Sequence, residues 1–205
     1  MTRSGPSSEL KALTRSIKEI ETRFLTPHLG PPTLTVPSGK EILDVAAYVV
    51  LVHGALENFA EGLALWLLAR YVGNWTTRKR PTRATASLLL YQKVPSDDAP
   101  TLSVFDNIRT ALDDARVRMS KVVNDNHGVT LQHLRTLFMP LGVTVQRTRY
   151  LTASLDLLVA MRHQWAHQDR RRAKVIKSAK DAQNTVSDCL ALAKKLSTEA
   201  AAVRP

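Results

Sequence analysis

The chain of 205 residues has little of several things on which whole classes of protein depend. Its single cysteine, Cys189, excludes an internal disulfide, and no H-E-x-x-H motif for a catalytic zinc is present. Apolar neighbours at Leu190 and Ala193 predict that the thiol packs within a helix face. We therefore expect a reducing, cytoplasmic setting.

Uncharged apolar runs of bilayer length are also missing. The most apolar segment carries Asp44, Glu57 and Glu61, and the first six residues lack the apolar stretch of a secretory signal. Alternation of apolar and polar residues is too short to predict a sheet, and we find no internal repeat. The sequence thus predicts a soluble, all-α protein with no membrane partner.

Acidic residues are scarce relative to basic ones. The chain holds 29 Lys and Arg against 18 Asp and Glu, which gives a formal net charge of +11 and a pI near 10.2. Such an excess of cations favours a polyanionic partner, without specifying which anion. The length and a hydrophobic content of 44% fit one domain with a substantial core.

Apolar periodicity and capping residues predict seven helices. The first carries a stripe from Leu10 to Phe24, and Ser38 with Glu41 forms a capping box for a long central helix ending near Tyr71. Later helices are expected at residues 84–92, 103–123, 130–139, 148–168 and from Ser178 onward. We expect a single domain over residues 1–205, in which the segments 1–37, 38–170 and 171–205 are a leading helix with its loop, the core, and a basic segment with the last helix.

Groups suited to catalysis concentrate at the end of the helix expected over 148–168. There Arg162, His163 and His167 lead directly into Arg170-Arg171-Arg172. A guanidinium is a permanent cation shaped to bind two phosphate oxygens, and an imidazole can both accept and donate a proton near neutral pH. This combination beside a basic run indicates chemistry on RNA phosphodiesters.

Three segments of the chain resemble one known family. Arg162 and His167 match the R-x4-6-H motif of the HEPN superfamily, in the form R-x4-H. The segment from Tyr48 to Phe59 is similar to the long helix of the RiboL-PSP-like HEPN branch, and residues 126–143 are similar to that branch's short helix and closing turn. The three segments stand in the right order and cover most of residues 40 to 170.

The resemblance implies an all-α, HEPN-like helical bundle built on a long central helix, assembled as a two-fold homodimer. It implies a metal-independent endoribonuclease, of the kind found among toxins and phage-defence effectors. The ribose 2′-OH would attack the adjacent phosphorus and leave a 2′,3′-cyclic phosphate and a 5′-OH end. RNA is then the expected substrate, with no cofactor and no metal, and an antitoxin or other regulatory protein is a further expected partner.

Helix geometry agrees with the dimer. Arg162 and His167 are separated by roughly 140° around one helix, so they do not share a face unless the helix ends or distorts between them. Two copies of that helix packed across a two-fold axis could converge both pairs on one phosphate. One His167 would take the 2′-OH proton and the other would protonate the leaving oxygen, while Arg162 neutralises the phosphate. We assign His163 to positioning the phosphate or assisting proton transfer, and Glu57 to orienting Arg162 or a neighbouring histidine.

Two positions depart from the superfamily pattern. His163 stands where Asn commonly follows the motif arginine, which changes the local hydrogen bonding. Asp169 stands where toxins silenced by a partner nucleotidyltransferase have a tyrosine, two residues beyond the motif histidine. Silencing by nucleotide transfer to that tyrosine is therefore not available to this chain.

Two basic clusters are the predicted RNA contacts, one directly after the motif and one in a connector expected over residues 73–83. Their residues are Arg170, Arg171, Arg172, Lys174, Arg78, Lys79 and Arg80. No motif reads a base edge, so the sequence does not identify the RNA. Three further histidines have no supporting neighbours in the sequence and receive no role; these are His53, His127 and His133.

Each assignment has an alternative. Arg162 as a helix-end cation, His167 as a packed or surface histidine and Glu57 as a structural ion pair would all be inert. Trp165 continues an apolar stripe and is expected in the core or the dimer interface. Zinc could use His163 and His167, four residues apart, but no cysteine lies near them. The non-enzymatic alternative is an inactive helical dimer that binds RNA or a partner protein through its basic face.

Overall fold

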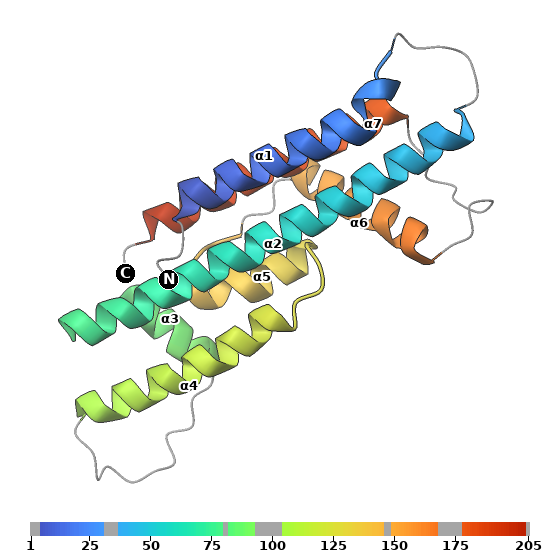
Figure 1. The fold of residues 1–205 in the computed structure, drawn as a ribbon. Helices are drawn as coiled ribbons and strands as arrows, with labels where there is room; N and C mark the ends of the chain where they lie inside the picture. Colours follow the sequence, from blue (N-terminus) through green and yellow to red (C-terminus); the bar gives the residue numbers. More distant parts are fainter. Residues whose placement is uncertain are drawn as a thin grey trace.

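Seven α-helices and two short 3₁₀ turns make up the chain in a computed structural model, which describes residues 5–30, 37–79, 82–92, 104–145, 149–167 and 178–203. No strand occurs among these residues, so the expected all-α class is confirmed. The helices lie around one long member, α2, which runs the length of the bundle (Figure 1). Each helix predicted from the sequence is present, and the differences lie at the ends of the helices.

The central helix α2 (Gly39–Arg78) begins where expected, because the Ser38 hydroxyl accepts a hydrogen bond from the Glu41 N–H at 3.1 Å. Its predicted end near Tyr71 is wrong. The helix continues through Gly73 because buried Trp75 anchors the next turn in the core. It ends at Lys79, whose φ of 52° is left-handed. The connector expected over residues 73–83 is therefore mostly helix.

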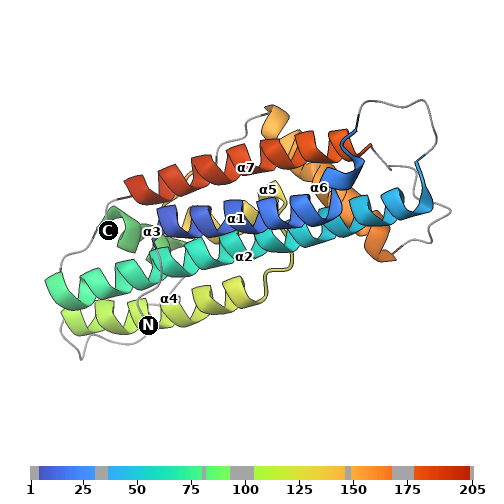
Figure 2. The same ribbon diagram turned by 45° about the horizontal axis from the view of Figure 1, so that its top comes forward.

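The other helices cover α2 from several sides. Figures 1 and 2 show α1 (Pro6–Phe24) and α7 (Ala179–Ala202) running side by side along α2, with α4 (Val104–Asn124) on another side. The Ser197 hydroxyl on α7 donates to the Pro6 carbonyl at 3.0 Å. Cys189 is buried on α7 as predicted, and burial raises the pKa of its thiol to about 12.

The shorter helices close one end and one side of the bundle. α3 (Arg83–Gln92) packs on η2 (Met139–Leu141), which continues α5 (Leu131–Phe138). The buried Tyr71 hydroxyl of α2 donates to the Leu141 carbonyl at 2.6 Å, and Gly142 then turns the chain at a φ of 71°. α6 (Arg149–His167) follows and packs on both α2 and α7.

Buried residues lie on several sides of α2, which confirms its predicted role as the core helix. The same apolar composition makes α2 long and apolar enough to cross a membrane by length and composition alone, although 44% of that stretch is buried inside the bundle. This criterion tolerates two charged residues in the stretch, so it does not contradict the expectation that Asp44, Glu57 and Glu61 leave no uninterrupted apolar run of bilayer length. A core helix of a helical bundle passes the same test.

Candidate functional site

The motif helix α6 is regular from Arg149 to His167. Because its backbone neither ends nor changes helix type between Arg162 and His167, the two residues leave the axis roughly 140° apart. They do not share a face of one protomer. The side chains of residues 165–167, and hence of His167 and Trp165, lie outside the described part of the structure.

Arg162 is half-buried and lies close to α2. Its positive charge lowers the pKa of both His53 and Glu57, which stand one turn apart on that helix. The structure therefore brings the predicted partners Glu57 and Arg162 into one neighbourhood, although they do not form an ion pair in it. His163 is exposed.

Glu57 has a half-buried carboxyl whose pKa is raised. Burial is the largest cause and the neighbouring Glu61 adds to it, while Arg162 and then His127 and His133 lower the pKa in part. Two carboxyl groups and several cationic or titratable groups thus meet on one side of α2. A nearby cation such as Arg162 therefore stabilises the ionised form of Glu57.

His53 is the buried member of this neighbourhood, with 4% of its surface exposed. Burial lowers the pKa of its imidazole to about 4, and the charges of Arg162 and His133 contribute. His53 is therefore neutral at pH 7 and cannot act as a general acid there.

The loop between α4 and α5 closes over the same side of α2. Buried Asn126 uses its amide Nδ2 to donate to Glu61 Oε1 at 2.9 Å and to the Gly128 carbonyl at 3.1 Å. Thr130 caps α5, and its hydroxyl oxygen lies 2.7 Å from Nδ1 of His133. The Asn126 bond ties the loop to the Glu61 carboxyl of α2, and the Thr130 contacts hold the first turn of α5.

We call this set the Arg162 cluster; its members are His53, Glu57, Glu61, Asn126, His127, Thr130, His133 and Arg162. The sequence alone assigned no role to its three histidines, and the structure places all three beside Glu57, Arg162 or both. One signal was present in the sequence. His53, Glu57 and Glu61 follow one another at steps of four, which aligns three titratable groups on one face of a helix.

The two predicted RNA-binding residues that the structure describes do not lie at the cluster. Arg78 and Lys79 are exposed at the far end of α2, about 30 Å along the axis from Glu57 at 1.5 Å per residue. The remaining members of the prediction, Arg80, Arg170, Arg171, Arg172 and Lys174, lie outside the described residues.

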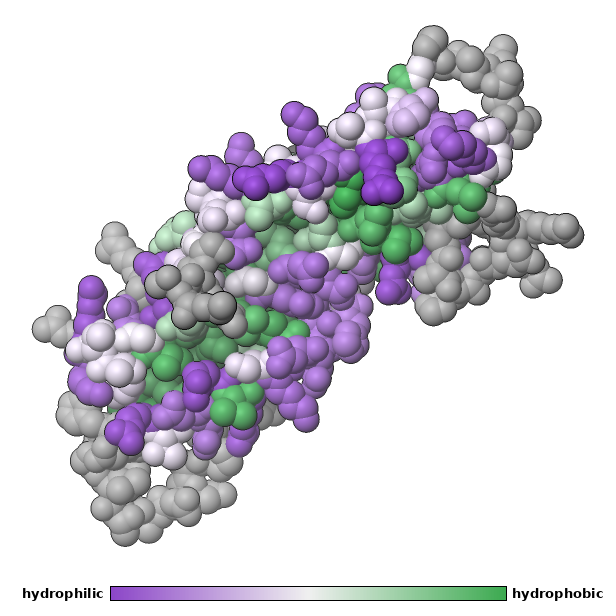
Figure 3. Space-filling view, in the orientation of Figure 1, coloured by the Kyte–Doolittle hydropathy of each residue, from purple (hydrophilic) through white to green (hydrophobic). Residues whose placement is uncertain are grey.

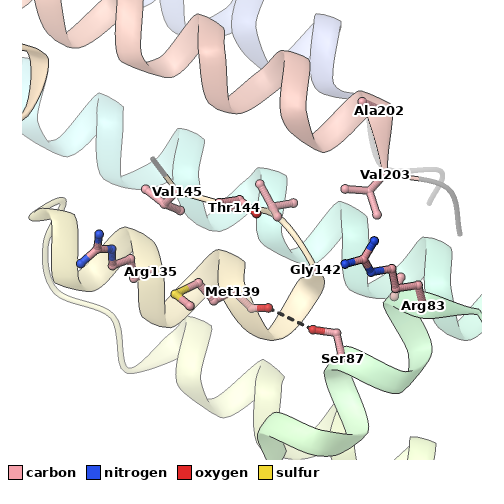
Figure 4. Close-up of a pocket in the computed structure, with 11 residues that line it drawn as sticks. Arg83, Ser87, Arg135, Met139, Gly142, Thr144, Val145, Ala202 and Val203 are labelled. Carbon is pink, nitrogen blue, oxygen red and sulfur yellow. Dashed lines mark hydrogen bonds between the residues drawn. The ribbon is translucent and has the colours of Figure 1, made fainter. Parts of the chain in front are cut away.

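A separate groove of about 860 Å³ opens between α3, the α5–η2 segment and the end of α7. Figure 4 shows Arg83 and Arg135 on opposite sides of it, with Met139, Val145 and Val203 among its apolar walls. Neither arginine forms an ion pair with a described residue. Among the described residues that line the groove there is no histidine or carboxylate, so these residues can attract an anion but offer no group for proton transfer.

Metal binding has no support within the described residues, where no group of three or more His, Cys, Asp and Glu could hold an ion. The zinc alternative uses the side chain of His167, which lies outside the described part of the structure, so this alternative stays untested.

Comparison with known proteins gives one match. The family model described as RiboL-PSP-HEPN matches residues 9–202, which span all seven helices from α1 to α7. No curated protein and no solved structure matches the chain. The match agrees with the family that the three sequence segments resemble.

Proposed function

The chain belongs to the RiboL-PSP-HEPN family, and from that premise we propose that it is a metal-independent endoribonuclease that acts as a toxin or defence effector. HEPN domains are commonly ribonucleases, so membership supports a role on RNA in general. The observation that carries the specific proposal is the position of Arg162. The motif arginine lies half-buried, close to buried His53 and to Glu57, a carboxyl whose pKa burial raises, in surroundings that a helix-end cation does not require.

The proposed reaction is transesterification at phosphorus. A histidine removes the proton from a ribose 2′-OH, the freed oxygen bonds to phosphorus, and the P–O5′ bond breaks as a second histidine protonates the 5′-oxygen. The products are a 2′,3′-cyclic phosphate and a 5′-OH end. Arg162 stabilises the negative charge that grows on the non-bridging oxygens, and Glu57 keeps the guanidinium in place.

A two-fold dimer supplies the second set of groups. Since Arg162 and His167 leave one α6 helix on different sides, we propose that α6 of a second copy brings its own pair to the shared cleft. Exposed Leu43, Val50 and Leu51 support an interface near this place, because they stand on the half of α2 that carries His53. Figure 3 shows apolar surface over that half of α2.

In the second candidate function, the basic surface binds a polyanion but the protein catalyses no reaction. The groove between Arg83 and Arg135 favours it, since two arginines without ion pairs can bind a polyanion with no catalytic group nearby. In this case the protein would be a helical dimer that binds RNA or a partner protein.

Incubation of purified protein with total RNA in EDTA separates these functions. We expect cleavage that leaves 5′-OH ends and persists in the chelator, and we expect His167→Ala to lower the rate by about two to four orders of magnitude. Binding without cleavage would support the non-catalytic dimer, and loss of cleavage in EDTA would support the zinc alternative. Full activity in His167→Ala would remove His167 from the reaction.

Light scattering at micromolar concentration tests the shared cleft. We expect twice the mass of one chain for the wild type. A strictly monomeric protein that still cuts RNA would contradict the composite site.

A further inference from the structure

His133 is fixed in position by local structure to a degree that a surface histidine is not. It stands at the third position of α5, where its backbone N–H donates to the Thr130 hydroxyl oxygen at 3.2 Å. Its ring Nδ1 lies 2.7 Å from the same oxygen. One capping residue therefore holds both the backbone and the ring of His133.

Gly128 fixes the other side of the ring. A Cβ added to Gly128 would lie 2.8 Å from Cε1 and 2.9 Å from Nδ1 of His133, closer than real contacts of this kind. The ring can therefore lie against the loop only because residue 128 is glycine. Asn126 holds that loop in turn, through its bonds to the Gly128 carbonyl and to Glu61.

The hydrogen bond to Thr130 favours one tautomer of the His133 ring. A hydroxyl oxygen has two acceptor sites, and here it can accept from the backbone N–H and from Nδ1–H of His133 at once. In that arrangement Nδ1 carries the ring hydrogen, and Nε2, which bonds to no described residue, has the lone pair that can accept a proton.

The surroundings of His133 are those of the proposed reaction. The charges of His133 and Arg162 both act on His53 and on Glu57, so the two residues share the same part of the Arg162 cluster. Glu57, Glu61 and His53 face this place from α2, His127 from the loop and Arg162 from α6. Buried His53 is already neutral at pH 7. His133 on α5 is only half-buried, so part of its surface is open to a substrate.

We propose that Nε2 of His133 is the general base of the cleavage reaction, an inference that rests on the proposed ribonuclease function. Nε2 accepts the 2′-OH proton as O2′ bonds to phosphorus, and protonated His167 gives its proton to O5′ as the P–O5′ bond breaks. Each cleavage then uses one His133 and one His167, in place of two copies of His167. Water afterwards removes the proton from His133 and returns one to His167.

The test compares two substrates in EDTA. Both are synthetic single-stranded RNAs that carry the dinucleotide cut most often in total RNA, one with an ordinary phosphodiester and one with a 5′-bridging sulfur. A thiolate leaves without being protonated, so the sulfur substrate needs the base but not the acid. We expect His133→Gln to lose at least about a hundredfold in rate on both substrates. We expect His167→Ala to lose rate on the first and to recover on the second.

Two controls separate chemistry from folding. Glutamine at position 133 can still bond to the Thr130 hydroxyl but cannot take up a proton, and Gln132→Ala changes the exposed neighbour on α5 and should keep the wild-type rate. For His133→Ala, added imidazole should restore part of the rate, which a purely structural role does not predict. Melting curves followed by circular dichroism verify that each variant is folded.

The outcomes distinguish this inference from the function on which it rests. If the wild type cleaves neither substrate, both proposals fall. If the wild type cleaves, Arg162→Ala does not and His133→Gln cleaves both substrates within about threefold of the wild type, the ribonuclease stands and His133 is not its base.

Discussion

The Arg162 cluster and the Arg83–Arg135 groove both present guanidinium groups to an incoming anion, yet their surroundings differ. In the cluster, the arginine lies near buried His53 and the half-buried Glu57 carboxyl, and nearby hydrogen bonds join Asn126 to Glu61 and Thr130 to His133. In the groove, the two arginines stand over apolar walls without an ion pair to a described residue. Forming the cluster costs folding free energy, because burial disfavours the charged forms of Glu57 and His53. The described residues that line the groove include no such carboxyl group or histidine.

This difference indicates what each place can do. Positive charge alone concentrates phosphate near a surface, but cleavage needs a proton acceptor and donor within reach of the phosphate. Of these two places, only the cluster combines a cation with such groups among the described residues. The raised pKa of Glu57 and the lowered pKa of His53 reflect the free-energy cost of burying these two groups, and such shifts are common at functional sites.

The largest expected effect comes from replacing an arginine by a lysine in the cluster, and the matching replacement in the groove is its control. Arg162→Lys should lose at least about a hundredfold in turnover, because an ammonium cannot make the planar two-point contact with a phosphate. Arg83→Lys should cleave like the wild type, since the groove supplies only charge. Steady-state kinetics on one RNA measures both variants. Equal loss in the two would show that the comparison between the places is wrong.

Acid sensitivity should come from the cluster through His53. Its folded pKa of about 4 lies below the ordinary value of 6.5, so the unfolded chain binds more protons between these values. Stability is therefore complete above pH 6.5 and falls as the pH drops toward 4, by about 3 kcal/mol at 1.36 kcal/mol per pKa unit.

Urea unfolding at pH 7 and at pH 4 measures this effect. His53→Leu should remove most of the dependence, while Arg135→Gln in the groove should leave it unchanged. A wild-type dependence retained by His53→Leu would assign the acid sensitivity to other groups.

A smaller effect of opposite sign is expected at Glu57. Its folded pKa lies above the ordinary value, so the stability it contributes is present below about pH 4.5 and is lost as the pH rises through the folded pKa. As the pH rises through the folded pKa, the carboxylate ionises and destabilises the fold, so the excess of urea that Glu57→Gln needs for unfolding over the wild type should grow as the pH is raised from 4 to 8. The same variant should cleave RNA more slowly. A variant both less stable and fully active would remove Glu57 from the site.

Local sequence predicted most of the fold. Ser38, Thr130 and Ser178 start their helices as capping residues, and Gly142 ends the α5–η2 segment in the left-handed region. The end of α2 was not predicted, because Gly73 resembles a helix end unless the burial of Trp75 is known. Helix starts depend on nearby residues, whereas this helix end depends on tertiary packing.

The candidate site was less accessible to prediction for the same reason. Arg162 was recognised from its motif spacing, but Asn126 and His133 come close to the carboxyl groups of α2 only because the loop before α5 folds back onto Glu61. Such contacts join residues 65 positions apart in the chain. The roles of Arg162, His163, His167 and Glu57 stay predictions until activity is measured.

The central claim is that RNA is cut at the Arg162 cluster and not merely bound by the basic surface. Sequencing of RNA 5′-OH ends after brief expression in cells tests it most directly, with the wild type, Arg162→Lys and Arg83→Lys side by side. We predict new ends at the same positions for the wild type and Arg83→Lys, and none for Arg162→Lys. New ends of equal number and position with Arg162→Lys would contradict the claim.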